Sequence, residues 1–164
     1  MTDNGMKIIK SAFIVDGRDH HVEALVGKLR QADIDEIAAS TGGDPDEILR
    51  RSWNNSKIRY AIMWKGEVVG VFGVAPLWLS SMVGIVWMMG SDRVSEISLS
   101  MVRLGREFIE KMMDEYPVLC NWVDARNELS IKWLKKVGFE VSDKVSAVWG
   151  GDVPFHFFEI GRLK

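Results

Sequence analysis

The segment VDARNELSIKWLKKVGFE, residues 123–140, carries the strongest structural signal in the sequence. It begins as the end of a strand, continues through an asparagine helix cap at Asn127, and stops at Gly138. Between these two residues the apolar side chains recur at helical spacing, which places one face of the helix in the core. The segment therefore predicts a strand that leads directly into a packed helix, the unit of an α/β fold.

Further elements are predicted on both sides of this unit from alternation, helical periodicity and turn residues. In chain order they are a strand at 7–15, helices at 20–40 and 45–54, strands at 58–64, 68–74 and 84–89, a helix from 94 or 95 to 116, and strands at 118–124, 141–149 and 154–160. A strand–helix–strand unit inside antiparallel hairpins predicts a mixed sheet with helices on both faces. We expect one domain over residues 1–164.

Composition limits the classes of function. The chain has 164 residues, a net charge of -2 and a single cysteine, Cys120. A protein that grips nucleic acid through phosphates is usually basic, so we expect no nucleic-acid partner. One cysteine excludes an internal disulfide framework and a cysteine-rich zinc site. The pair His20-His21 is interpreted as a solvated helix start, and no metal site is predicted.

The uncharged run at residues 68–91 is long enough to span a bilayer. Its glycines, Pro76 and two serines split it into two shorter apolar segments, which favours two neighbouring strands covered on both faces. We therefore expect no membrane span. No signal peptide is recognised at the N-terminus, which predicts a cytoplasmic protein, and a virion location is the alternative.

The quoted segment resembles a known motif. ARN at 125–127, Ser130, and KKVGFE at 135–140 are similar to the last strand–helix motif of the GCN5-related N-acetyltransferases (GNAT). The hairpin KGEVVGVFG at 65–73 is similar to the second and third strands of that superfamily. The resemblance covers about residues 58–139. It implies a GNAT-like α/β fold, acetyl-CoA as cofactor, and transfer of an acetyl group from CoA to an amine substrate.

The resemblance also implies where the cofactor lies. In that family acetyl-CoA occupies a cleft between the strands that correspond here to residues 84–89 and 118–124. The pantetheine arm pairs with the backbone of the first of these strands, and the pyrophosphate rests at the start of the following helix. The implied cofactor-binding residues are Trp87, Met88, Met89, Ser95, Ser98, Ser100, Asn127 and Ser130.

The sequence departs from the family pattern in three places. Serines replace the glycines of the pyrophosphate loop, Leu134 stands where many members have a tyrosine acid, and Gly84 stands where a glutamate base is common. Asp124 is the best-placed remaining carboxylate and is the expected catalytic residue, accepting the amine proton directly, with water as the alternative acceptor. The competing interpretation of Asp124 is a strand-end carboxylate that supports the helix start.

A narrower resemblance points to a second function. GSDRV at 90–94, EYPVLCNWV at 115–123 and IKWLKKVG at 131–138 are similar to small internal virion proteins of short-tailed phages. This implies a phage-encoded protein and, as the alternative to catalysis, an inactive GNAT-fold protein that binds a virion or host protein. Trp78, Leu79 and Met82 would form a partner surface if exposed, but burial is the expectation for such residues. A homodimer through the last strands is common in such folds.

Overall fold

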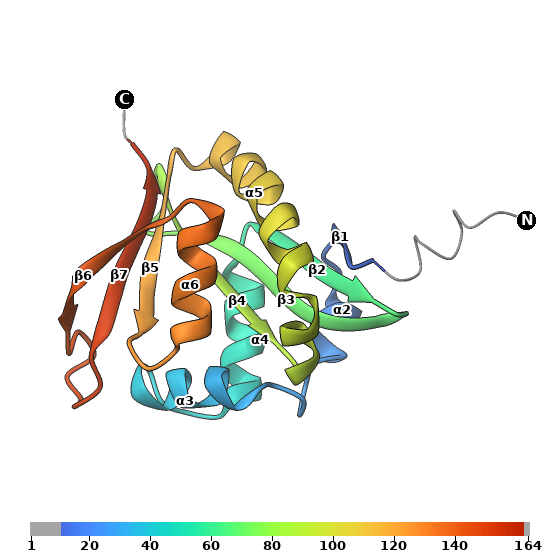
Figure 1. The fold of residues 1–164 in the computed structure, drawn as a ribbon, viewed down its shortest axis with the longest axis horizontal. Helices are drawn as coiled ribbons and strands as arrows, with labels where there is room; N and C mark the ends of the chain where they lie inside the picture. Colours follow the sequence, from blue (N-terminus) through green and yellow to red (C-terminus); the bar gives the residue numbers. More distant parts are fainter. Residues whose placement is uncertain (1–10, 163–164) are drawn as a thin grey trace, which may run out of the picture.

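The computed structural model describes residues 11–162, and a seven-stranded sheet runs through its centre (Figure 1). The sheet has the order β1-β2-β3-β4-β5-β7-β6. Its strands are β1 (Phe13–Asp16), β2 (Ile58–Trp64), β3 (Glu67–Pro76), β4 (Val83–Gly90), β5 (Val118–Asp124), β6 (Glu140–Ser146) and β7 (Phe155–Gly161). Only β4 and β5 pair in parallel, and all other neighbours are antiparallel. The predicted mixed α/β sheet is confirmed.

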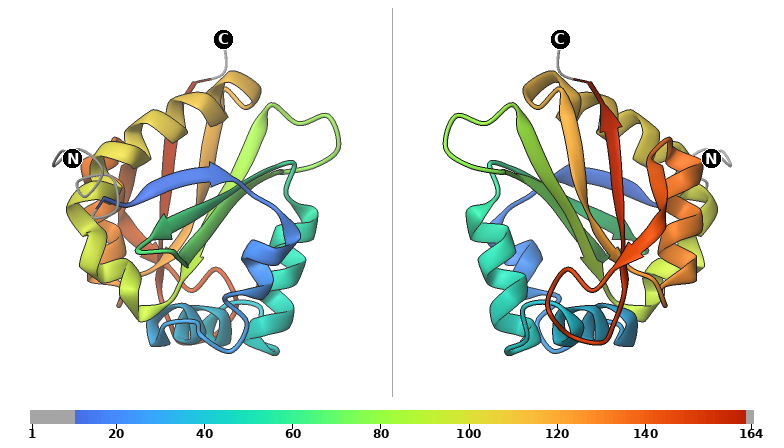
Figure 2. Two further views of the ribbon diagram at one scale, coloured as in Figure 1. Left: turned by 90° about the vertical axis from the view of Figure 1, so that its right-hand side faces the viewer. Right: turned by 90° about the vertical axis from the view of Figure 1, so that its left-hand side faces the viewer.

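Helices cover both faces of this sheet, as expected (Figure 2). They are α2 (Asp19–Glu23), α3 (Gln31–Ala39), α4 (Pro45–Asn55), the 3-10 helix η1 (Asp92–Ile97), α5 (Ser98–Glu115) and α6 (Glu128–Val137). Helices α5 and α6 bury their apolar residues against one face, whereas α2 and α4 pack on the other. Helix α3 contacts β5 and lies across the lower edge of the sheet in Figure 1.

The elements around the quoted segment form for the predicted reasons. The Asn127 side chain accepts a hydrogen bond from the Ser130 N–H at 3.3 Å, and Gly138 ends α6 at a φ of 112°. In the hairpin turn, Lys65 and Gly66 both adopt positive φ, as a two-residue turn between twisted strands requires. Residues 68–91 lie in β3, β4 and their connection, and no helix among the described residues is long and apolar enough to cross a membrane.

Three predicted elements are corrected. The single helix expected at 20–40 is two helices, because Gly27 adopts a φ of +76° and its N–H donates to Asp46 Oδ1. The helix expected from 94 or 95 begins as η1 and becomes α-helical only at Ser98. The strand expected at 141–149 ends at Ser146, before the two-glycine turn. Residues 7–10 of the first predicted strand lie outside the described residues.

Candidate functional site

The parallel strands β4 and β5 separate near their middle. They pair only over Val83–Ile85 and Val118–Cys120. At the point of separation the Asn121 amide nitrogen donates to the Val86 carbonyl at 2.7 Å, so a side chain replaces the missing backbone pairing. Beyond it a cavity of about 360 Å³ opens between the strands and reaches α3, α4 and α6.

The edge of β4 that faces this cavity carries one free pair of backbone groups. At one end of this edge, the Val86 carbonyl accepts a hydrogen bond from the Asn121 side chain. At the other end, the Gly90 N–H donates to Asp33 and the Gly90 carbonyl accepts from the Arg30 N–H. Alternate residues of a strand direct their N–H and C=O groups to the same edge, so those of Met88 lie between these two residues and face the cavity. No hydrogen bond in the described part of the chain occupies them.

The three β4 residues predicted to bind cofactor therefore differ in what they offer. Trp87, Met88 and Met89 all line the cavity. The backbone groups of Trp87 and Met89 point toward β3, opposite Gly73 and Val71. Only Met88 presents backbone hydrogen-bonding groups to the cavity, while its neighbours contribute side chains.

The side chains of β4 divide the cavity into two sides. Val86 and Met88 pack with the core under α5 and α6, whereas Trp87 and Met89 pack with the core under α2 and α4. We call the first region the α6 side; it is lined by Val86, Met88, Asn127, Ser130, Trp133 and Leu134. We call the second the α3 side; it is lined by Glu36, Ile37, Ser40, Thr41, Ser52, Asn55, Trp87, Trp122 and Trp149.

The predicted serine loop is only partly assembled at this site. Ser95 and Ser98 line a smaller hollow of about 50 Å³ that adjoins the α6 side at Met88, Ser130 and Trp133. The Ser95 hydroxyl donates to the Asp92 carbonyl at 2.8 Å, which leaves the exposed Ser98 hydroxyl as the freer group. Ser100 lines neither cavity, so the structure does not bring it to the site.

Arg30 adds a positive charge to the cavity, which was not predicted from the sequence. It lies immediately before α3 and lines both cavities. Its guanidinium pairs with the buried Asp33 at 2.9 Å and lies 3.5 Å from the Ser130 hydroxyl. The Arg30–Asp33 pair ties the start of α3 to the end of β4, because Asp33 also accepts from the Gly90 N–H.

The indole N–H of Trp133 is an unsatisfied donor on the α6 side. Nε1 is buried and has no hydrogen-bond partner, which holds for no other buried side-chain N or O atom of residues 11–162. Trp133 lines both the main cavity and the hollow beside Ser98. A buried donor without a partner costs about 1–3 kcal/mol, which a bound acceptor atom would recover.

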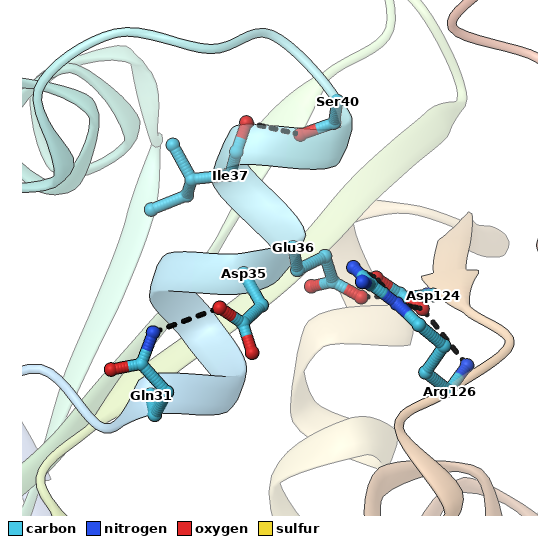
Figure 3. Close-up of polar contacts among 7 residues, drawn as sticks. All are labelled: Gln31, Asp35, Glu36, Ile37, Ser40, Asp124 and Arg126. Atoms are coloured by element: carbon cyan, nitrogen blue, oxygen red, sulfur yellow. Dashed lines mark hydrogen bonds and ion pairs between the residues drawn. The ribbon is translucent and has the colours of Figure 1, made fainter. Parts of the chain in front are cut away.

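The geometry of Asp124 favours its supporting interpretation. Its carboxylate is buried and receives bonds from the Arg126 side chain at 2.6 and 3.0 Å and from the Arg126 N–H at 2.8 Å (Figure 3). Burial raises the pKa of Asp124, but the bonds from Arg126 outweigh it and leave the pKa below its usual value. A carboxylate held in this way is a weak base that stabilises the turn between β5 and α6.

Glu36 is the carboxylate that sequence reasoning missed. It projects from α3, and its Oε1 accepts from the Asp124 N–H at 2.7 Å (Figure 3). Burial raises the pKa of Glu36 to about 7; the nearby charges of Asp33 and Asp124 add to this effect, and the bond from the Asp124 N–H opposes it. A carboxyl group that titrates near neutral pH on the wall of a cavity is suited to accept a proton.

Two of the three departures from the family pattern, Leu134 and Gly84, have a structural explanation. Leu134 is buried and lines the cavity, so an apolar side chain stands at the position of the implied acid. A Cβ on Gly84 would lie 2.4 Å from Val74 Cγ2 and 2.9 Å from the Tyr116 ring. No side chain fits there, so β4 cannot carry a carboxylate at this position.

The remaining candidates are accounted for by local structure. Burial raises the pKa of the Cys120 thiol, with the charge of Glu159 as a second cause. The His21 ring accepts from the Arg18 N–H at 3.0 Å and thereby caps α2. Within the described ranges no three His, Cys, Asp or Glu side chains are grouped to hold a metal ion.

A mixed sheet whose one parallel pair splays around a cavity is the architecture of the GNAT acetyltransferases, and solved structures of that fold match this chain. An N-acetyltransferase from Staphylococcus aureus Mu50 matches with a TM-score of 0.67 at 17% identity, over 93% of this chain and 99% of that one. A GCN5-related N-acetyltransferase from Kribbella flavida gives 0.65 at 18% identity, over 93% and 98%. The structure of yncA from Salmonella typhimurium with its cofactor acetyl-CoA gives 0.63 at 14% identity, over 93% and 94%.

At these identities the likeness shows the fold alone, because one fold carries many functions. No protein-family model matches the sequence, and no curated protein matches it significantly. The GNAT fold expected from the sequence is confirmed. The structures named above give no support to the resemblance to phage internal virion proteins.

Proposed function

We propose that this protein is an acetyl-CoA-dependent N-acetyltransferase. The observation that carries the proposal is the cavity between β4 and β5, into which Met88 directs a free backbone N–H and C=O. This arrangement offers an amide-bearing arm a strand edge to pair with. The solved structure of yncA, with the same fold, contains acetyl-CoA, which supports this assignment.

The residues of the α6 side fit the arm of the cofactor. Met88 offers one backbone donor and one acceptor, and the Trp133 N–H is a second donor without a partner. Asn127 and Ser130 begin α6 beside them. When bound, acetyl-CoA supplies an acyl group that is already activated as a thioester.

The protein offers fewer contacts to the diphosphate of the cofactor than a glycine-rich loop would. Ser98 and the Arg30 guanidinium are the groups on the hollow that favour an anion. Asp92 occupies the first turn of η1, and Glu96 is exposed in the same helix. We assign the phosphate contacts to Arg30 and Ser98, and expect the affinity for the nucleotide part alone to be low.

The acceptor amine is placed on the α3 side, where Glu36 is the proton acceptor. An amine must lose a proton to become nucleophilic, and a carboxyl group of pKa about 7 can take it at neutral pH. Asp124 acts as a positioning residue, since its N–H donates to Glu36 Oε1 at 2.7 Å. The hydrogen bond from the Asn121 side chain to the Val86 carbonyl spans the gap between β5 and β4, where the α6 side and the α3 side meet.

The test is thermal unfolding with and without millimolar acetyl-CoA, with desulfo-CoA and ADP as controls. A ligand at about 100 times its Kd adds about 2.7 kcal/mol of stability, which is several degrees for a domain of this size. A shift with acetyl-CoA that ADP does not produce supports the proposal. No shift at any concentration up to several millimolar would contradict it.

A second candidate is an inactive interaction protein, and one observation favours it. In the β3–β4 connection Trp78, Leu79 and Met82 are 63%, 92% and 56% exposed, and Leu77 beside them is exposed as well. Such a loop is costly in water and typical of a contact with another protein. A phage origin is compatible with either candidate, and the virion location belongs to this one. This candidate predicts that acetyl-CoA does not change the unfolding temperature. It also predicts that Trp78→Ser abolishes binding of the partner protein, whereas Trp149→Ser retains it.

A further inference from the structure

Three tryptophans from separate parts of the chain meet on the α3 side of the cavity. Trp87 comes from β4, Trp122 from β5 and Trp149 from the connection between β6 and β7. Trp87 and Trp122 are half-buried, and Trp149 is 45% exposed at the opening. Aromatic walls on several sides are suited to hold an apolar body or a cation.

Neighbouring contacts hold these rings in place. The Trp87 indole N–H donates to the Ser56 hydroxyl at 2.6 Å, and that hydroxyl donates to the Ser52 carbonyl at 2.7 Å. The Trp122 ring packs 5.2 Å from Phe157, and Trp149 lies edge-on to Phe155. Because the rings are held before any ligand binds, little side-chain entropy is lost on binding.

Acidic side chains outnumber basic ones around these rings. Arg30, Asp33 and Glu36 are the only titratable side chains that line the cavity among the described residues. Two guanidiniums act on Glu36, and each is paired with another carboxylate: Arg30 with Asp33 at 2.9 Å and Arg126 with Asp124 at 2.6 Å. The other polar groups there are neutral, namely Ser40, Thr41, Ser52 and Asn55.

We propose that the acceptor is a small ammonium compound with an apolar, preferably aromatic body and no carboxylate beside its amine. This inference rests on the proposed function and names the substrate class of the same site. The ammonium group lies against Glu36 and the tryptophan faces, and the body fills the space that Trp122 and Trp149 enclose. A carboxylate on the acceptor would be repelled by Glu36, while Arg126 is paired with Asp124, and Arg30 is paired with Asp33 and assigned to the cofactor phosphates.

The size of the cavity limits the acceptor to a small molecule. The volume of about 360 Å³ also has to hold the thioester end of the cofactor on the α6 side. We expect the charge to disfavour a free amino acid, and the limited room inside the opening to disfavour a longer peptide. The proposed acceptor is thereby distinguished from amino acids and from peptides.

The experiment is a calorimetric titration at pH 8, where Glu36 is ionised, with and without saturating coenzyme A. The probes are 2-phenylethylamine, L-phenylalanine, which adds a carboxylate, and 2-phenylethanol, which removes the charge. We expect 2-phenylethylamine to bind at least about 10-fold more tightly than either of the others, a difference of about 1.4 kcal/mol. A tetrapeptide that begins with phenylalanine should bind more weakly than 2-phenylethylamine.

Matched variants place the binding on the α3 side. Glu36→Gln and Trp149→Leu should each weaken 2-phenylethylamine binding about 5-fold or more, through the lost charge and the lost ring face. Trp78 lies in the exposed β3–β4 connection, so Trp78→Leu should leave 2-phenylethylamine binding unchanged. Equal binding of the three probes, tighter binding of the peptide, or no effect of the first two variants would overturn the inference.

The outcome is separable from that of the proposed function. If acetyl-CoA stabilises the protein and no amine in the panel binds with or without coenzyme A, the substrate class is wrong and the acetyl-CoA site stands. If 2-phenylethylamine binds and acetyl-CoA does not, the amine site stands and the acetyltransferase proposal fails.

Discussion

The two sides of the cavity are built in different ways. The α6 side uses backbone groups of β4 and the capped start of α6, all within residues 86–134, and its motif is visible in the sequence. The α3 side brings Glu36 against Asp124 across 88 positions and adds Trp149 from a third region. Backbone groups persist wherever the fold persists, whereas side chains from distant segments can vary freely. The α6 side therefore reflects the fold, and we expect the α3 side to determine which acceptor is used.

This comparison predicts that changes on the α3 side alter turnover without altering acetyl-CoA affinity. Replacing Glu36 with Gln should reduce kcat by about 100-fold or more, the usual contribution of a general base. In the unchanged protein the rate should rise with pH through about 7, as Glu36 ionises, and this limb should be absent in the variant. Steady-state kinetics across pH 5.5–9 and acetyl-CoA titrations measure both.

The control for this prediction is Asp35→Asn, one residue earlier on α3. Asp35 is exposed and accepts from Gln31, away from Asp124 (Figure 3). This variant should keep its kcat within about twofold. A Glu36→Gln enzyme that retains more than a third of its activity and its pH profile would return the proton acceptor to water or Asp124.

Changes on the α6 side should do the opposite, and Ser98→Asp is the largest of them. A carboxylate on the hollow beside Arg30 would repel the diphosphate, so acetyl-CoA affinity should fall at least about 10-fold with little loss of stability. Ser100→Asp is the matched control, because Ser100 lines neither cavity. Equal losses in both variants, measured by calorimetry, would show that the phosphate lies elsewhere.

The same difference explains what could be read from the sequence. The hairpin, β5, the Asn127 cap and the Gly138 stop follow from local patterns, and all were predicted. The helix expected at 20–40 was wrong because the periodicity of apolar residues continues through Gly27, where the backbone turns. Apolar spacing indicates which residues are buried, but a single positive φ decides whether one helix becomes two.

In the candidate site, too, the residues with a local sequence pattern were predicted, and those that depend on distant contacts were not. Met88 and Ser98 were found through a resemblance in local sequence, and the structure adds only which of their groups face the cavity. Glu36 carried no sequence signal, because its raised pKa comes mainly from burial, with smaller contributions from Asp33, three residues earlier, and from Asp124, distant in the chain. Asp124 was the nearest carboxylate to the recognised motif, and its partner Arg126 is too common a residue to reveal the ion pair in advance.

The ionisation of Glu36 should also appear in stability. Its pKa rises from 4.5 in the unfolded chain to about 7 in the folded one, so the folded state binds the proton more tightly. This contribution is fully present below about pH 4.5 and is lost as the pH rises through 7. The loss is about 1–3 kcal/mol.

Comparison with Glu36→Gln isolates this effect from other titrating groups such as Asp124, whose lowered pKa acts in the opposite direction at acidic pH. The variant should be more stable than the original protein at pH 8 and equally stable at pH 4.5, as measured by urea unfolding at each pH. An identical difference at both values would mean that Glu36 titrates normally.

The smallest expected effect tests the unsatisfied donor on the α6 side. Trp133→Phe removes an N–H that is buried and without a partner, so the protein without ligand should be as stable as before or slightly more stable. If that N–H donates to the cofactor arm, acetyl-CoA affinity should fall about 2- to 10-fold, the worth of one hydrogen bond of about 0.5–1.5 kcal/mol. Two changes of opposite sign from one substitution distinguish a ligand donor from a packing residue: a ring that only packs would lose stability and affinity together. Calorimetry and thermal unfolding of the same variant decide between them, and unchanged affinity would show that the cofactor arm leaves the Trp133 N–H unpaired.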